Sequence, residues 1–199
     1  MPQAAPIESL IHALGEPDLP ARTDAAKEIF LLGRELAEPA VKQWLADTEM
    51  MRLFSMEDVG FPIATVGLAV QPATFERIRI ANGSPSLAEV PPDQDAREFE
   101  LHFSGSVRLD VLTTREPGGA GAIARFLGKL GEGVQQVELL VHGVDRATQI
   151  LLTRFGIPAV YPAPRAGADR TRVNFFLVPA PQEKKVLIEL VEPSGQNKN

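Results

Sequence analysis

Apolar residues recur every three to four positions through the first 52 residues of the chain. This is the spacing of amphipathic helices, so the whole stretch is predicted to be helical. Residues 6–14 form the first helix, and Gly15 and Pro17 are expected to end it. A second and broader apolar stripe runs through residues 25–36. The chain is therefore predicted to begin with at least two consecutive helices.

The second helix is expected to be capped by Thr23 or Asp24, whose side chains can accept a hydrogen bond from the first turn. Pro39 suits the first turn of a third helical piece. Residues 1–55 in this order are similar to one HEAT-like repeat, although a plain helical hairpin that serves as a lid or dimer element explains them equally well. A single repeat cannot bury its own apolar face, so we expect it to pack on the rest of the chain or on a second copy.

Strand patterns begin at residue 62. Residues 62–70 are rich in Ile, Val and Leu, and residues 97–113 alternate as a β-hairpin that turns at Ser104-Gly105-Ser106. Residues 71–97 give no clear pattern: 75–81 fit either a strand or a short helix, and 82–95 have the composition of a surface loop.

The pattern becomes regular after residue 121. A helix closed by Gly131 and Gly133 is followed by a strand at 134–141, and a helix capped by Asp145 and ended by Gly156 is followed by two strands. This order predicts an α+β fold in which two βαβββ units form an open β-cup. The cup domain is expected at residues 60–193, after the helical segment 1–55.

Composition narrows the classes of partner. A net charge of −6 argues against nucleic acid, and the lack of cysteine excludes thiolate metal sites and a cysteine nucleophile. No apolar run approaches the roughly 20 residues of a membrane helix, and the first residues show no secretory signal pattern. We therefore expect a cytoplasmic protein that binds neither nucleic acid nor a membrane, and whether it forms a homodimer stays open.

Two segments carry a family resemblance: GAIARFLGKLGEGVQQVELLV at 121–141 and VLIELVE at 186–192. They resemble the methylmalonyl-CoA epimerases of the glyoxalase/vicinal-oxygen-chelate superfamily, and TVGLAV at 65–70 is similar to the first strand of that family. The resemblance is specific over 121–192, thinner over 62–113, and absent from 1–55. It implies a cup whose floor holds a divalent metal ion on four side chains, two of them usually histidines.

The resemblance places Thr65 and Gln136 at the positions of the two histidines. The hairpin ligand falls on or next to Asp110, and the last ligand matches Glu189. Asp110, Gln136 and Glu189 are therefore the candidate metal ligands. The ions considered are Mg²⁺, Mn²⁺ and Co²⁺, of which the first two suit oxygen donors best.

Strand alternation defines an inner face independently. If Glu189 faces inward, the inner residues are Thr65, Arg108, Asp110, Gln136, Glu138 and Glu189. The guanidinium of Arg108 can replace a metal ion as the charge partner of buried carboxylates. A metal-free floor is therefore the alternative to a divalent ion site, and the pattern favours it slightly.

The resemblance implies an isomerase or lyase that acts next to a carbonyl group on a small acid or an acyl-CoA. Glu189 and Glu138 are the candidate catalytic bases. The candidate substrate-binding residues are Thr65, Arg108, Gln136, His102 and Phe176. Phe175 and Phe176 point to opposite faces of their strand, and alternation leaves open whether His102 faces the cup or solvent.

Two further interpretations remain open from the sequence. One is a metal-free module that binds a small molecule, and the other is a protein-association domain with a degenerate site. Arg165, Arg170 and Arg172 fit an anionic ligand, although solvated loop charges are the commoner explanation of such a cluster.

Overall fold

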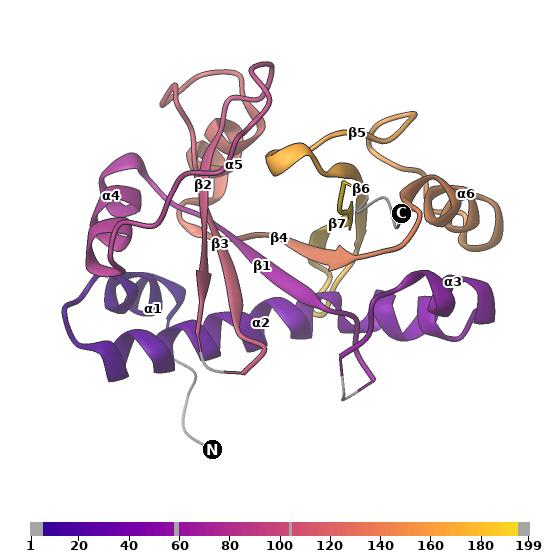
Figure 1. Ribbon diagram of the computed structural model, residues 1–199, viewed down its shortest axis with the longest axis horizontal. Coiled ribbons are helices and arrows are strands. Elements are labelled where there is room, and N and C mark those ends of the chain that lie inside the picture. The colour runs from indigo at the N-terminus through magenta and orange to yellow at the C-terminus, as the bar shows by residue number, and fades with distance from the viewer. Residues whose placement is uncertain (1–5, 58–59, 104, 195–199) are drawn as a thin grey trace, which may run out of the picture. The chain divides into compact units, whose positions relative to one another are not determined.

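The computed structural model describes residues 6–57, 60–103 and 105–194 (Figure 1). The elements in chain order are α1 (Ile7–Leu14), α2 (Leu19–Leu45), α3 (Thr48–Leu53), β1 (Ala64–Ala69), α4 (Pro72–Ala81), β2 (Arg97–His102), β3 (Arg108–Thr113), α5 (Ala122–Leu130), β4 (Gly133–Leu140), α6 (Val144–Phe155), β5 (Arg165–Ala166), the 3₁₀ turn η1 (Ala168–Arg170), β6 (Arg172–Pro179) and β7 (Lys185–Glu192). They form two compact units: unit 1 holds the described residues up to Gly33 together with Thr65–Gln135, and unit 2 holds Arg34–Ala64 and the described residues from Gln136.

The sheet of unit 1 has the strand order β2-β3-β1. β1 runs parallel to β3 with Gly67 opposite Asp110, and β2 runs antiparallel to β3 with Glu100 opposite Asp110. One face is apolar, because Val66, Phe99 and Leu109 alternate with the polar positions of their strands and are buried. This face therefore forms the core of unit 1.

Helices α1 and α4 and the first part of α2 cover this core. Phe75 of α4 meets Phe99 of β2 edge-on, with the ring centroids 4.8 Å apart. The side-chain amide of Asn82 donates to the carbonyls of Leu14 and Ile78, the last turns of α1 and α4, which lie side by side in Figure 1. One side chain thus satisfies backbone carbonyls at the ends of two helices.

Gly33 allows α2 to lie unusually close to β1. A Cβ atom at this position would lie 2.5 Å from Cγ2 of Val66 and 2.6 Å from its Cγ1. The close approach of helix and strand therefore requires a residue with no side chain.

The sheet of unit 2 has the strand order β4-β7-β6-β5. β4 and β7 are parallel with Glu138 opposite Glu189, and β6 and β7 are antiparallel with Phe175 opposite Glu189. The core lies on the other face, where Trp44 stacks on Phe54 and meets Phe176 edge-on. In both units the first long strand pairs in parallel with the last, so the two units repeat one topology.

The strand predictions are confirmed, including the hairpin of β2 and β3. Ser104 of its predicted turn lies outside the described residues. The ambiguous residues 75–81 belong to helix α4, which starts with Pro72 and buries Phe75 and Ile78 three positions apart. The α+β fold class is thus confirmed, with three strands in unit 1 and four in unit 2 within the described ranges.

Helix boundaries differ from the prediction at two points. α2 begins at Leu19, and Asp18 accepts the backbone N–H of Ala21, so neither Thr23 nor Asp24 caps it. No third helix starts at Pro39, because α2 continues through it to Leu45. Buried packing of the turns on either side holds the helix together despite the missing N–H.

Asp145 also differs from its predicted role. The residue that caps α6 is Gly143, and Asp145 lies inside the first turn of the helix. The carboxylate of Asp145 instead accepts a hydrogen bond from Arg172 at 2.7 Å. Gly156 ends the helix in the left-handed conformation, as predicted.

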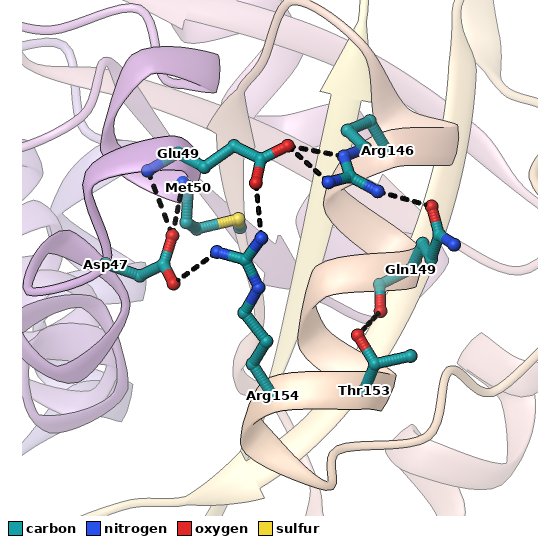
Figure 2. A network of polar contacts seen from close by, with 7 residues as sticks. All are labelled: Asp47, Glu49, Met50, Arg146, Gln149, Thr153 and Arg154. Carbon is teal, nitrogen blue, oxygen red and sulfur yellow. Dashed lines mark hydrogen bonds and ion pairs between the residues drawn. The ribbon is translucent and has the colours of Figure 1, made fainter.

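Helices α3 and α6 of unit 2 are joined by a polar network (Figure 2). Asp47 caps α3 by accepting the N–H groups of Glu49 and Met50, and its other oxygen pairs with Arg154 of α6 at 2.7 Å. Glu49 binds both Arg146 and Arg154. These contacts lower the pKa of Asp47, first through the Met50 N–H and then through Arg154, and the two arginines lower the pKa of Glu49.

Candidate functional site

The non-core face of the unit 2 sheet carries a buried polar cluster. Gln136 and Glu138 alternate with the core residues of β4, and Glu189 does the same on β7. Gln136 is 6% exposed and Glu189 is 7% exposed. Polar groups that are this buried need hydrogen-bond partners, because desolvation is costly.

The Gln136 amide supplies these partners. Its nitrogen donates to Oε2 of Glu189 at 2.6 Å and to Oε1 of Glu138 at 3.1 Å. Two carboxylates on neighbouring strands are thus bridged by one neutral donor group. The sequence prediction that these three residues share a face is confirmed by the strand register.

Unit 1 carries a comparable face. Asp110 is 6% exposed, and its ladder neighbours are Gly67 on β1 and Glu100 on β2. The matching neighbours of Glu189 in unit 2 are Glu138 on β4 and Phe175 on β6. With Thr65 aligned to Gln136, as the family resemblance implies, Asp110 takes the ladder position that corresponds to Glu189.

The remaining predicted residues of unit 1 lie near this face. Thr65 is buried in β1. Arg108 is paired with His102 across the β2–β3 ladder. His102 is exposed, and its Nε2 lies 2.7 Å from a carboxylate oxygen of Glu100. Thr65, Arg108, His102 and Asp110 belong to unit 1, whereas Gln136, Glu138 and Glu189 belong to unit 2.

Phe176 lies on the other side of its sheet from the position that we expected. It is fully buried in the core of unit 2 against Trp44. Phe175 is the residue that shares a face with Glu189, because the two are opposite each other in the antiparallel β6–β7 ladder. The alternation was predicted correctly, but only the register shows which of the two phenylalanines faces the carboxylates.

Two residues beside Phe175 were not assigned to the site from the sequence. The Tyr161 ring meets Phe175 edge-on at 5.9 Å, and the guanidinium of Arg165 lies 4.7 Å from the centroid of the Tyr161 ring. The sequence pattern places Arg165 only in a cluster of three loop arginines. Nothing in the local pattern singles out Tyr161, because its contact with Phe175 depends on how the loop packs against β6.

Asp95 anchors the segment that follows β3. Its carboxylate accepts hydrogen bonds from the hydroxyl of Thr114 and from the backbone N–H groups of Arg115 and Glu116. These bonds, the Thr114 hydroxyl first, lower the pKa of Asp95. The Asp95 carboxylate therefore holds the backbone in place just before the glycine-rich stretch 117–121.

The side chains of the unit 2 cluster do not fit a metal ion as they are arranged. Gln136 directs N–H groups at the carboxylate oxygens that a cation would need, and neither histidine of the resembled family is present. Within the described ranges no group of three or more His, Asp or Glu side chains is placed to hold a metal. The three-residue metal set Asp110, Gln136 and Glu189 stays a prediction, and no chemical step below relies on it.

Comparison with solved structures identifies the fold family. Methylmalonyl-CoA epimerase from Mycobacterium tuberculosis is 31% identical, with a TM-score of 0.53 over 66% of this chain and 87% of that one. A variant of methylmalonyl-CoA epimerase from Streptomyces coelicolor, in complex with 2-nitronate-propionyl-CoA, is 26% identical with a TM-score of 0.51 over 66% of this chain and 96% of that one. The chain belongs to the glyoxalase/vicinal-oxygen-chelate superfamily.

Within this superfamily the chain is epimerase-like. A hypothetical protein from Bacillus halodurans shares the fold at 24% identity, with a TM-score of 0.53 over 68% of this chain and 96% of that one. No protein-family model matches the sequence, and the comparison with curated proteins gives no match. No helix in the described part of the chain has the length and apolarity needed to cross a membrane.

Proposed function

We propose that this protein is an isomerase or lyase that removes a proton next to a carbonyl group of a small acid or an acyl-CoA. The carboxylates of Glu138 and Glu189 are the candidate bases. The observation that carries the proposal is their adjacency across the β4–β7 ladder, beneath the single amide of Gln136.

Two adjacent carboxylates suit reversible proton transfer. One carboxylate accepts the proton from the carbon next to the carbonyl, which leaves an enolate, and a protonated carboxyl group returns a proton to that carbon. Return to the other side of the carbon inverts its configuration, and the reaction consumes no second reactant. Gln136 holds both side chains in place, because each accepts a hydrogen bond from the same nitrogen.

The relatives support a substrate class for this proposal. One solved methylmalonyl-CoA epimerase contains methylmalonyl-CoA, and the Streptomyces coelicolor variant contains 2-nitronate-propionyl-CoA. The proposal therefore favours an acyl-CoA with an acidic hydrogen next to the thioester carbonyl.

Deuterium exchange tests the proposal directly. The protein is incubated with methylmalonyl-CoA in D₂O, and incorporation at the carbon next to the thioester is followed by mass spectrometry. Glu189→Gln and Glu138→Gln each remove one candidate base with little change in shape. We expect at least one of them to slow the exchange about 10²- to 10⁴-fold. Glu35→Gln, on an exposed position of α2, is the charge-matched control and should leave the rate unchanged.

Exchange that is absent from the unsubstituted protein, or unaffected by either substitution, would exclude the carboxylates as bases for this substrate. The same assay with other acyl-CoA thioesters and small 2-oxo acids extends the test to the rest of the proposed class.

A metal-free binding module is the second candidate. It is favoured by the arrangement of Gln136, whose side-chain nitrogen already donates to one oxygen of each carboxylate. This candidate predicts saturable binding of an acyl-CoA or small acid with no deuterium incorporation. Binding accompanied by exchange at the substrate carbon would contradict it.

A further inference from the structure

Asn82 and Gly83 form the turn that follows helix α4 in unit 1. An asparagine followed by glycine is open to spontaneous deamidation, because glycine has no side chain that shields its backbone nitrogen from the neighbouring amide. Gly83 is exposed, and no heavy atom of the described residues, its chain neighbours apart, lies within 4 Å of the point where a Cβ atom would be. The turn therefore leaves room for the ring that this reaction forms.

The reaction needs only the protein and water. The backbone nitrogen of Gly83 attacks the side-chain carbonyl carbon of Asn82, a C–N bond forms, and the proton of the attacking nitrogen passes to solvent. The side-chain nitrogen of Asn82 takes up a proton and leaves as ammonia. Water then opens the five-membered imide at either of its two carbonyl groups. Asparagine and water thus give ammonia and either aspartate or isoaspartate.

Ring closure requires the last turn of α4 to open. The backbone N–H of Asn82 donates to the Ile78 carbonyl at 3.1 Å, and the N–H of Gly83 donates to the Ile80 carbonyl at 3.2 Å. Attack by the Gly83 nitrogen breaks the second of these bonds. Because helix ends open at a much lower free energy than buried core elements, the reaction can proceed without unfolding of the whole protein.

The amide that is lost joins two helices. Its nitrogen donates to the Leu14 carbonyl at 3.0 Å and to the Ile78 carbonyl at 2.8 Å. The Leu14 carbonyl lies in the last turn of α1, where helix geometry provides no backbone partner. The two helices approach closely here, since a Cβ atom at Gly15 would lie 2.7 Å from Nε of Arg77. Asn82 therefore fixes the end of α1 against α4.

A carboxylate at this position cannot make the same contacts. Ionised aspartate has no hydrogen-bond donor, so its oxygens would face the two carbonyl oxygens that the amide now binds. Isoaspartate also adds one carbon to the main chain between Asn82 and Gly83. Leu10, Ile11 and Leu14 of α1 are buried in the unit 1 core, so loosening of the helix exposes apolar surface.

We propose that Asn82–Gly83 is a site of spontaneous deamidation and that loss of the Asn82 amide releases the end of α1 from α4. The modification adds one negative charge to unit 1. Glu138 and Glu189 belong to unit 2 and take no part in it, so this inference is independent of the proposed function.

Peptide mapping tests the first half of the proposal. The protein is incubated at mildly alkaline pH, digested with trypsin, and analysed for a gain of one mass unit. Residues 80–97 and 173–184 form separate tryptic peptides with one asparagine each, Asn82 and Asn174. Asn174 is fully buried and is followed by phenylalanine, so it is the internal control. Asn82 should convert at least about 10-fold faster, and both aspartate and isoaspartate should appear.

Amide hydrogen exchange of α1 tests the second half. Asn82→Asp reproduces one product and should speed exchange in α1 by about 10- to 100-fold, as expected when buried acceptors lose their donor. Asn82→Ala removes the donor without adding charge and should have a smaller effect. Ser86→Asp adds the same charge at an exposed position of unit 1 and should leave α1 unchanged. Exchange in α6 of unit 2 serves as the reference in every variant.

Each half of the proposal has results that overturn it. Conversion of Asn82 no faster than that of Asn174, or a product that is aspartate alone, would exclude ring closure by Gly83. Exchange in α1 that is unchanged in Asn82→Asp, or equally fast in Ser86→Asp, would exclude the release of α1. The mapping experiment uses the unsubstituted protein, so it stands even if Asn82→Asp does not fold.

Discussion

The side-chain nitrogen of Gln136 lies 2.6 Å from a carboxylate oxygen of Glu189. In the resembled family a histidine is expected at the position of Gln136, and Glu189 matches a metal ligand. In this chain the same two positions carry a hydrogen bond from an amide to a carboxylate. This substitution suggests a way to restore metal affinity.

Gln136→His should create a metal site on the unit 2 face. An imidazole beside the carboxylates of Glu138 and Glu189 supplies the nitrogen ligand that Co²⁺ and Zn²⁺ prefer. At about 100 times its dissociation constant, a metal ion adds roughly 2.7 kcal/mol to the free energy of unfolding. For a chain of this size we expect Tm to rise by about 5–10 °C.

Thermal unfolding with and without Co²⁺ checks this expectation, and EDTA should reverse the rise. The double variant Gln136→His/Glu189→Gln is the control and should lose most of it. An equal metal response in the unsubstituted protein would show that the ion binds elsewhere.

The network of Asp47, Glu49, Arg146 and Arg154 predicts a loss of stability in acid. The pKa values of both carboxyl groups are lowered in the folded state from 3.8 and 4.5, so folding favours their charged forms. Their contribution is fully present above these unfolded values and disappears as the pH falls through the lower, folded values. Both groups are solvent-accessible, so the effect is expected to be modest.

The double variant Asp47→Asn/Glu49→Gln removes both titrations, and the asparagine can still cap α3. The difference in Tm between the unsubstituted protein and this variant should be constant above about pH 5 and shrink below pH 4. Glu35→Gln serves as the control, with a difference that does not follow the same curve. A difference that stays constant down to the lowest pH at which both proteins fold would contradict the prediction.

Gly33→Ala should destabilise the protein even though alanine is the better helix former. The helix propensity gain is about 1 kcal/mol, but the new Cβ would lie 2.5 Å from Val66 Cγ2, and such overpacking costs about 1–3 kcal/mol. Calorimetric unfolding measures the net effect. In a Val66→Ala background the same substitution should be less destabilising, and equal effects in both backgrounds would exclude the contact as the cause.

Thr113→Val should stabilise unit 1. Thr113 is fully buried, and its hydroxyl has no hydrogen-bond partner in the part of the chain that the structure describes. Valine has nearly the same shape without the unsatisfied group, so we expect a gain of about 1 kcal/mol. Calorimetry measures the gain.

The neighbouring substitution Thr114→Val provides the control. The Thr114 hydroxyl binds the Asp95 carboxylate and the Glu116 carbonyl, so its removal should lower stability. A loss of stability in Thr113→Val of the same size would contradict the distinction between the two hydroxyl groups.

The local pattern of the sequence predicted most elements, but of the strand pairings only those between consecutive strands. Alternation identified β4 and β7 and placed Gln136, Glu138 and Glu189 on one face, because the period of a strand is fixed by covalent geometry. The helix at 72–81 was ambiguous because Ile80 is exposed and its position mimics a strand pattern. The continuation of α2 through Pro39 depends on buried packing, which a local signal does not contain.

In the candidate site, too, the local pattern predicts some features, whereas others depend on packing between segments. The choice between Phe175 and Phe176 is decided by the pairing of β6 with β7, and the position of Tyr161 by hydrogen bonds from Val160 and Asn174. Both depend on contacts with a neighbouring segment, which the pattern of a single strand or loop does not contain. Alternation within one strand defines two faces, but the pairing with the neighbouring strand determines which of them carries the polar site residues.

The location of the aromatic chromophores has a practical consequence. The chain has one tryptophan and one tyrosine, and both Trp44 and Tyr161 belong to unit 2. Near-ultraviolet fluorescence therefore reports on the core of unit 2 around Trp44 and on the opposite sheet face around Tyr161 and Phe175. Unit 1 has only phenylalanine and contributes almost no emission. If the two units melt at different temperatures, an optical trace follows one of them, and its midpoint should differ from that of the heat-absorption peak.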